Sequence, residues 1–207
     1  MRQQFNFSDG LKEISRRLNR SPHPLLLAIA GGSCSGKSYL TAQLQELQGS
    51  EAVSVCLDDF FKDEDDPTLP YDDQGRLIFD LPDSYHQIEF QEMIQGLLRG
   101  EPAVLPCYEK GPNRRNPERS RLIQPAPIVM AEGLFALSFL ADFAIPQLRI
   151  FLDADLEMCL ERRIARDTVA FGVSADKVRK IFVSKVLPYY QDYVLPQRRL
   201  ADLVITS

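Results

Sequence analysis

The sequence predicts an α/β fold with a mostly parallel, five-stranded sheet flanked by helices. Five short apolar runs are spread over the 207 residues, and each is of the kind that forms a strand buried on both faces. Between them lie stretches whose apolar residues recur at helical spacing. Because strands and helices alternate along the chain, a parallel sheet is favoured over an antiparallel one.

The expected elements follow in chain order. A short amphipathic helix is predicted over Ser8 to Arg20, and Pro22 and Pro24 end it. The predicted strands are Leu25–Ala30, Val53–Leu57, Ile128–Ala131, Leu148–Leu152 and Leu203–Ile205. The predicted helices between them are Ser38–Gln48, Gln87–Arg99, Leu156–Arg166 and Ala175–Leu187. We therefore expect residues 1–24 to form a helical extension and residues 25–207 to form a single domain.

Two stretches break this alternation. Residues 58–75 carry eight acidic residues against one lysine, and residues 101–127 hold six of the fourteen prolines. We expect neither stretch to form a regular element. Long loops in a compact α/β domain are more often functional than idle, so both are candidates for the walls of a binding site.

Composition and charge exclude several classes of partner. The net charge of -5 provides no basic field that would attract nucleic acid or anionic membranes. The longest apolar run is too short to span a bilayer, and the N-terminus lacks the apolar region of a secretory signal. The cysteines are far apart, at Cys34, Cys56, Cys107 and Cys159, which argues against a zinc ribbon or a disulfide scaffold. We expect a cytoplasmic protein with no nucleic-acid or membrane partner; a homo-oligomer is left open.

A phosphate-binding loop follows the first predicted strand. The sequence GGSCSGKS matches G-x-x-x-x-G-K-[ST] and stands between a predicted strand and a predicted helix, as a P-loop requires. Its backbone N–H groups and the helix N-terminus bind phosphate oxygens. Lys37 is expected to reach the β- and γ-phosphates of ATP, and Ser38 to bind Mg²⁺. The predicted ATP-binding residues are Gly31, Gly32, Ser33, Cys34, Ser35, Gly36, Lys37, Ser38 and Tyr39.

Carboxylates follow two further predicted strands. Because ligands of open parallel sheets bind outside the carboxyl ends of the strands, these acids should adjoin the phosphate loop. Asp58 is expected to face the γ-phosphate, whereas capping of the turn is a sufficient explanation for Asp59. Glu132 is expected to hold Mg²⁺ or its water.

Arginines gather near the end of the predicted helix Leu156–Arg166. Arg162, Arg163 and Arg166 could complement the helix dipole, or they could stabilise charge on a transferred phosphoryl group. The next segment contains the glycine and small residues that are typical of a movable flap. We therefore expect a lid over about residues 162–176.

Seven motifs in this order resemble those of the uridine kinase family of P-loop kinases, in the phosphoribulokinase/uridine kinase group. They are GGSCSGKS, LDDFF, FDLPDSY, LPCYEK, MAEGLFAL, RRIARD and LPYYQDYVLPQRRLADLVI. The resemblance extends from about Leu25 to Ile205. It implies a P-loop NTPase fold and an enzyme that uses ATP and Mg²⁺ to phosphorylate a small molecule, most simply the 5′-hydroxyl of a nucleoside.

The resemblance also implies roles for single residues. Asp58 matches the family's general base, Asp80 the acid that holds the ribose hydroxyls, and Tyr108 lies in the base-contacting segment. The catalytic residues expected are Asp58, Lys37, Arg163 and Arg166. The substrate-binding residues expected are Asp58, Phe79, Asp80, Tyr108, Asn113 and Arg163. The metal-binding residues expected are Ser38, Asp58 and Glu132.

The chain also departs from the family pattern. Lys110 stands where the family has an aromatic residue, Asn113 where it has a histidine, and Phe171 where it has a further lid arginine. The stretch DDFFKDEDD is similar to that of nicotinamide riboside kinases. The same chemistry on nicotinamide riboside, pantothenate or a sugar acid is therefore an alternative. A nucleotide-binding regulatory ATPase or switch is an alternative from a different class.

Overall fold

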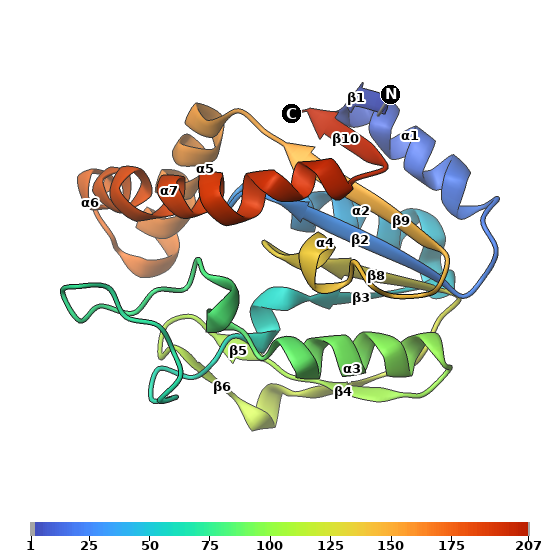
Figure 1. Cartoon of the computed structure of the whole chain (residues 1–207), viewed down its shortest axis with the longest axis horizontal. Coiled ribbons are helices and arrows are strands. Elements are labelled where there is room, and N and C mark those ends of the chain that lie inside the picture. The colour runs from blue at the N-terminus through green and yellow to red at the C-terminus, as the bar shows by residue number, and fades with distance from the viewer. Residues whose placement is uncertain (1–2, 207) are drawn as a thin grey trace.

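A six-stranded parallel sheet with helices on both faces forms the centre of the computed structural model, which describes residues 3–206 (Figure 1). The strand order is β1-β10-β9-β2-β8-β3, and all neighbouring strands are parallel. The strands are β1 (Gln3–Asn6), β2 (Leu25–Gly31), β3 (Ala52–Cys56), β8 (Ile128–Glu132), β9 (Gln147–Asp153) and β10 (Leu203–Thr206). The predicted parallel α/β architecture is confirmed.

The predicted number of five strands is wrong, because β1 adds a sixth. This strand lies at the edge of the sheet and pairs with β10, with Phe5 opposite Ile205. Its sequence, QQFN, is mostly polar and mostly exposed. An edge strand has one paired side and needs no continuous apolar run, so the pattern that predicted the buried strands could not detect it.

Strand β2 explains why a continuous apolar run is required at the centre of the sheet. Leu25, Leu27 and Ile29 pack on one face, with α1 (Phe7–Leu18) and α2 (Lys37–Gln48). The alternate residues of β2 pack on the other face, against α3 (Gln87–Leu98), α4 (Ala136–Phe139) and the helical pieces from Ala175 to Leu200, here called the C-terminal helical segment. Because both faces of the strand are covered, every side chain along it is buried.

The helices that follow β9 are longer than predicted. Helix α5 (Leu156–Phe171) continues past Arg166 and ends at Gly172, whose φ of +65° is left-handed. Helix α6 (Ala175–Ile181) runs on through the π-helical turns Phe182–Val186 and Tyr190–Val194, with α7 (Leu187–Tyr189) between them and the 3₁₀ turns Leu195–Leu200 after them. Pro188 and Pro196 each stand near the start of one of these helical pieces, where a missing N–H costs little. None of the helices within residues 3–206 is long and apolar enough to cross a bilayer.

The proline-rich stretch contains strands, contrary to prediction. Strand β4 (Ala103–Leu105) pairs with β7 (Arg121–Ile123), and β5 (Tyr108–Glu109) pairs with β6 (Arg114–Arg115), both antiparallel. The six prolines all lie outside these short strands, so they interrupt no ladder. The acidic stretch starts in a 3₁₀ helix, Leu57–Phe60, and has no longer element. Further 3₁₀ turns are Gly49–Glu51, Pro82–Ser84 and Pro117–Arg119.

Candidate active site

A cavity of about 1430 Å³ opens at the carboxyl edge of the sheet. Its walls come from the phosphate loop, the ends of β3 and β8, the segment before α3, the β5–β6 hairpin, and helices α5 and α6. Pockets for one small ligand measure roughly 300–1000 Å³. The cavity is therefore large enough to hold two substrates together.

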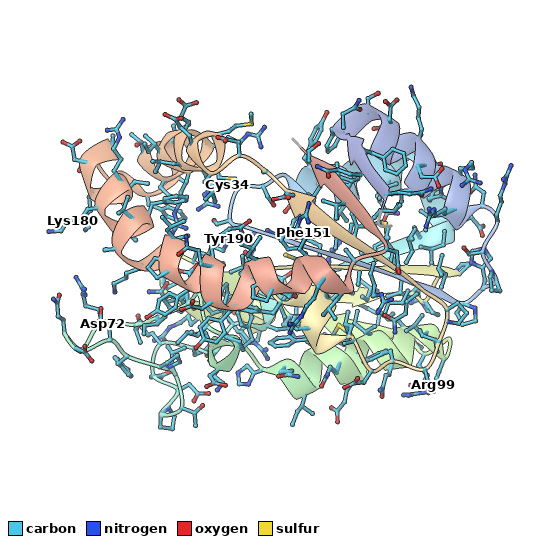
Figure 2. The ribbon with its side chains drawn as sticks, turned by 45° about the horizontal axis from the view of Figure 1, so that its top comes forward. Cys34, Asp72, Arg99, Phe151, Lys180 and Tyr190 are labelled. Atoms are coloured by element: carbon cyan, nitrogen blue, oxygen red, sulfur yellow. The ribbon has the colours of Figure 1, made fainter. Side chains whose placement is uncertain are left out.

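The phosphate loop forms the floor of this cavity. Gly36 has a φ of +100°, which a glycine adopts without strain, and helix α2 begins at the next residue. The Lys37 ammonium donates to the carbonyl oxygens of Gly31 (3.1 Å) and Gly32 (2.8 Å), so it lies against the loop. Cys34, in the middle of the loop, lies beneath α5 (Figure 2). All the predicted ATP-binding residues except Gly31 and Gly32 line the cavity.

Side-chain oxygen atoms that could bind a metal ion meet beside the loop. The Ser38 hydroxyl donates to Oε1 of Glu132 at 2.8 Å, and Glu132 is only 5% exposed although it lines the cavity. Gly133 follows Glu132, and no larger residue fits there, because a Cβ on Gly133 would lie 2.3 Å from the Cβ of Leu57. This close approach brings the ends of β3 and β8 together.

The residues present fit a hard divalent cation. Ser38, Glu132 and Asp58 provide only oxygen atoms, which such a cation prefers. Within residues 3–206, no three His, Cys, Asp or Glu side chains form a cluster that could hold a metal by themselves. Phosphate and water oxygens would therefore complete the coordination, as is usual for Mg²⁺.

Asp58 lies in the 3₁₀ helix after β3 and forms an ion pair. Its Oδ2 is 2.6 Å from Nζ of Lys110, which extends from the β5–β6 hairpin. Burial opposes ionisation of Asp58, but Lys110, Lys37 and Arg166 together outweigh it and hold the pKa of Asp58 below its ordinary value. Asp58 is thus a carboxylate at neutral pH and can accept a hydrogen bond from a hydroxyl.

The neighbouring carboxyl group has a different environment. Asp59 accepts a hydrogen bond from the backbone N–H of Tyr108 at 3.3 Å and does not line the cavity. Burial raises the pKa of Asp59. The hydrogen bond joins the end of β3 to β5, 49 residues further along the chain, and is not the turn cap that the sequence suggested.

Phe79, Asp80, Tyr108 and Asn113 are predicted substrate-binding residues that also line the cavity. Phe79 packs edge-to-face on Phe61, with ring centroids 5.4 Å apart, and Tyr108 packs on Phe61 at 5.3 Å. Burial raises the pKa of Asp80, although Arg163 opposes the shift. The buried hydroxyl of Tyr108 has no hydrogen-bond partner among the described residues. Asn113 lines the cavity with a left-handed φ of +49°.

The acidic stretch is joined to the C-terminal helical segment. Asp72 pairs with Nζ of Lys185 at 2.6 Å and with Nε of Arg76 at 2.9 Å. These contacts lower the pKa of Asp72, and the hydrogen bond from Lys185 contributes most. Figure 2 shows Asp72 at the same end of the molecule as Lys180 of α6. Both segments contribute to the lining of the cavity, Gln74 from the first and Lys185 from the second.

The arginines of α5 face the phosphate loop. Nη1 of Arg163 donates to Oγ of Ser33 at 3.3 Å, and Nη1 of Arg162 donates to the Cys34 carbonyl at 3.4 Å. Because α5 continues to Phe171, its last turn contains no basic residue. The helix dipole, which acts within the last turn, therefore does not explain these arginines.

Asp167 was missed by the sequence analysis. Its carboxylate accepts from Nε of Arg163 at 3.3 Å and from Nε of Arg166 at 2.8 Å, and the residue is only 9% exposed. Such a position holds both guanidinium groups toward the cavity. The sequence could have predicted this contact, because Asp167 lies four residues after Arg163, a spacing that favours an ion pair on one helix.

Replacing Arg166 by alanine is expected to lower kcat and kcat/KM together, by about 10²–10³-fold, if the guanidinium acts mainly in the transition state. Steady-state kinetics with both substrates varied would measure this. The matched control is Arg179→Ala, because Arg179 pairs with Asp176 on the exposed surface of α6. An unchanged kcat in Arg166→Ala would contradict a catalytic role.

The fold and the cavity define a P-loop kinase. The model of the phosphoribulokinase/uridine kinase family matches residues 26–207, and the chain belongs to this family. It is therefore a phosphotransferase that acts on an alcohol group of a small molecule, with ATP and a divalent metal as the family implies.

The individual relatives agree with this assignment. The chain is 28% identical to the uridine kinase of Chloroflexus aurantiacus, over 89% of this chain and 87% of that one. It is 30% identical to the uridine kinase of Deinococcus deserti, over 88% of this chain and 87% of that one. The phosphoribulokinase from Rhodobacter spheroides has a similar fold: the TM-score is 0.59 and the identity 17%, over 85% of this chain and 67% of that one.

Proposed function

We propose that this enzyme transfers the γ-phosphoryl group of ATP to the 5′-hydroxyl of a nucleoside. The observation that carries the proposal is the continuity of the cavity, which joins the phosphate loop to the carboxylates of Asp58 and Asp80. The uridine kinases that are 28–30% identical over most of this chain support a nucleoside as acceptor.

The proposed mechanism is positioning combined with electrostatic stabilisation. Lys37, Arg163 and Arg166 neutralise the γ-phosphoryl group, whose equatorial oxygens carry charge in the transition state. Asp58 accepts the proton of the attacking hydroxyl. Asp80 accepts hydrogen bonds from the vicinal hydroxyls of the ribose and so orients the acceptor.

The other residues hold the two substrates. The residues from Gly31 to Tyr39 bind ATP, and Phe79, Tyr108 and Asn113 contact the nucleoside. Ser38, Glu132 and Asp58 hold the metal, for which we propose Mg²⁺. When bound, Mg²⁺ offsets the negative charge of the β- and γ-phosphates.

In this proposal, residues 25–207 are the kinase domain and residues 162–176 are its lid. Strand β1 and helix α1 precede that domain in the sequence and extend its sheet and one helical layer. We further propose a cytoplasmic enzyme without nucleic-acid or membrane partners, and leave a homo-oligomer open.

The ion pair between Lys110 and Asp58 favours a second candidate acceptor. An acceptor hydroxyl that binds Asp58 competes with the Lys110 ammonium, which lies 2.6 Å from it. A neutral acceptor provides no new partner for this ammonium, whereas a carboxylate does. A small molecule with both a primary hydroxyl and a carboxylate, such as pantothenate or a sugar acid, is therefore the second candidate.

An acceptor screen tests these proposals. ADP release would be measured with ATP and, one at a time, uridine, cytidine, nicotinamide riboside, pantothenate and a sugar acid, with Lys37→Ala as the inactive control. We expect nucleosides to give the largest stimulation. If only pantothenate or the sugar acid stimulates ADP release, the second candidate replaces the first. ADP release that no acceptor changes would instead indicate a regulatory ATPase.

A further inference from the structure

The N-terminal segment, which lies outside the family match at residues 26–207, reaches the cavity. Phe7 is the first residue of α1, and it lines the cavity together with Tyr39 of α2. The two ring centroids are 5.4 Å apart and the ring planes are tilted by 32°. The two rings therefore contact each other, and both line the cavity beside the phosphate loop.

The strand β1 explains why Phe7 is there. It runs parallel to β10, with Asn6 opposite Thr206, so it ends at the same edge of the sheet as the strand that leads into the phosphate loop (Figure 1). Oδ1 of Asn6 accepts from the backbone N–H of Asp9 at 2.9 Å and caps α1, which fixes the start of the helix at Phe7.

The order of the strands shows which substrate these two rings face. Asp58 follows β3 at one edge of the sheet, the phosphate loop follows β2 in the middle, and Phe7 follows β1 at the opposite edge. In an in-line transfer the attacking hydroxyl and the departing nucleotide lie on opposite sides of the phosphoryl group. With the acceptor hydroxyl at Asp58, the nucleoside part of ATP extends toward β10 and β1.

We propose that Phe7 and Tyr39 form a stacking platform for the base of the nucleoside triphosphate. Tyr39 is 61% exposed, and an exposed ring beside a phosphate site presents the flat apolar surface on which a base stacks. Met158 and Arg162 of α5 line the same cavity. This inference rests on the proposed binding of the nucleotide to the phosphate loop, and it adds a nucleotide-binding residue from the segment that precedes the kinase domain.

The test compares a ligand that has a base with one that has none. Isothermal titration calorimetry would measure the affinities of ADP and of inorganic pyrophosphate for the wild-type protein, Phe7→Leu and Phe7→Tyr. We expect Phe7→Leu to weaken ADP binding by about 5- to 100-fold, the range for loss of one base–aromatic stack, and to leave pyrophosphate binding unchanged. Phe7→Tyr retains the ring and should bind ADP as the wild type does.

Two further variants keep the test decisive. Phe5→Leu is the matched control, because Phe5 lies two residues away on β1, packs on the core and does not line the cavity. It should bind both ligands normally. Tyr39→Leu alters the exposed half of the platform without removing a core residue. This variant should bind ADP more weakly than the wild type and pyrophosphate equally well.

Unchanged ADP affinity in both Phe7→Leu and Tyr39→Leu would overturn the platform. Equal weakening of ADP and pyrophosphate would overturn it as well, because it would show a structural effect on the phosphate loop. If the wild-type protein bound neither ligand, the proposed function would fail, and the platform with it.

Discussion

Replacing Asp58 by asparagine is expected to lower kcat by about 10²–10⁴-fold, the contribution typical of a general base, in a protein that still folds and binds nucleotide. The amide has the size of the carboxylate but cannot take a proton from the acceptor hydroxyl. Steady-state rates of ADP release give kcat, and calorimetry with ADP gives the nucleotide affinity. A near-normal kcat in this variant would contradict the assignment of Asp58 as the base.

The adjacent residue provides a matched control. Asp59→Asn makes the same chemical change one position later, where the side chain accepts a hydrogen bond from the Tyr108 N–H outside the cavity. An amide oxygen can also accept that bond, so kcat should change little. Lys37→Ala gives a different contrast. It should weaken nucleotide binding as well as the rate, because we propose that Lys37 contacts the phosphates in the ground state too.

The pH profile provides a second readout of the same residue. Because the pKa of Asp58 lies below its ordinary value, kcat/KM should stay level through neutral pH and decrease only as the pH falls through that lowered pKa. Lys110→Met removes the nearest cation, so burial then raises the pKa and the acidic limb should move to higher pH. An acidic limb that stays in place would show that it reports another group.

The central strands could be predicted from sequence because their burial is uniform. Strand β2 is covered on both faces, so its run of apolar residues carries the signal by itself. Strand β1 is polar and lies at the edge, and it is defined only by its pairing with β10 near the other end of the chain. The end of α5 was misplaced because the segment after Arg166 combines a glycine with small residues that also suit a flap; the helix uses Gly172 as its cap instead.

The same distinction holds for the site. The phosphate loop is local, and its glycines, lysine and serine are recognisable in one short stretch. The contact between Lys110 and Asp58 joins residues that are 52 positions apart, so the loss of an aromatic residue at position 110 could be noted but its new partner could not be predicted. Phe7 carried no signal, because only the pairing of β1 with β10 brings it to Tyr39.

The acceptor site should prefer ribonucleosides over their 2′-deoxy counterparts by up to about 10⁴-fold in kcat/KM, whichever base is preferred. The reason is the environment of Asp80, whose pKa is raised by burial. A desolvated carboxylate that accepts hydrogen bonds from both hydroxyls of a vicinal diol loses one partner when a hydroxyl is missing, and this loss is costly. By contrast, Lys110 and Asn113 stand where the resemblance places the contacts to a pyrimidine, so discrimination among bases should be weaker.

The measurement is kcat/KM for uridine, cytidine and nicotinamide riboside, each beside its 2′-deoxy analogue where one exists, in the wild-type protein and in Asp80→Asn. The variant keeps one acceptor oxygen but loses the charge, so its ribo-to-deoxy ratio should fall toward one, mainly through a lower kcat/KM for the ribonucleoside. Asp83→Asn is the matched control, because Asp83 follows in the same segment but does not line the cavity, and it should keep the wild-type ratio. Equal rates for ribo- and deoxynucleosides in the wild-type protein would show that Asp80 does not bind the diol. A protein that phosphorylates only pantothenate or a sugar acid would show that the kinase acts on a different acceptor, with the Lys110 ammonium as the partner of its carboxylate.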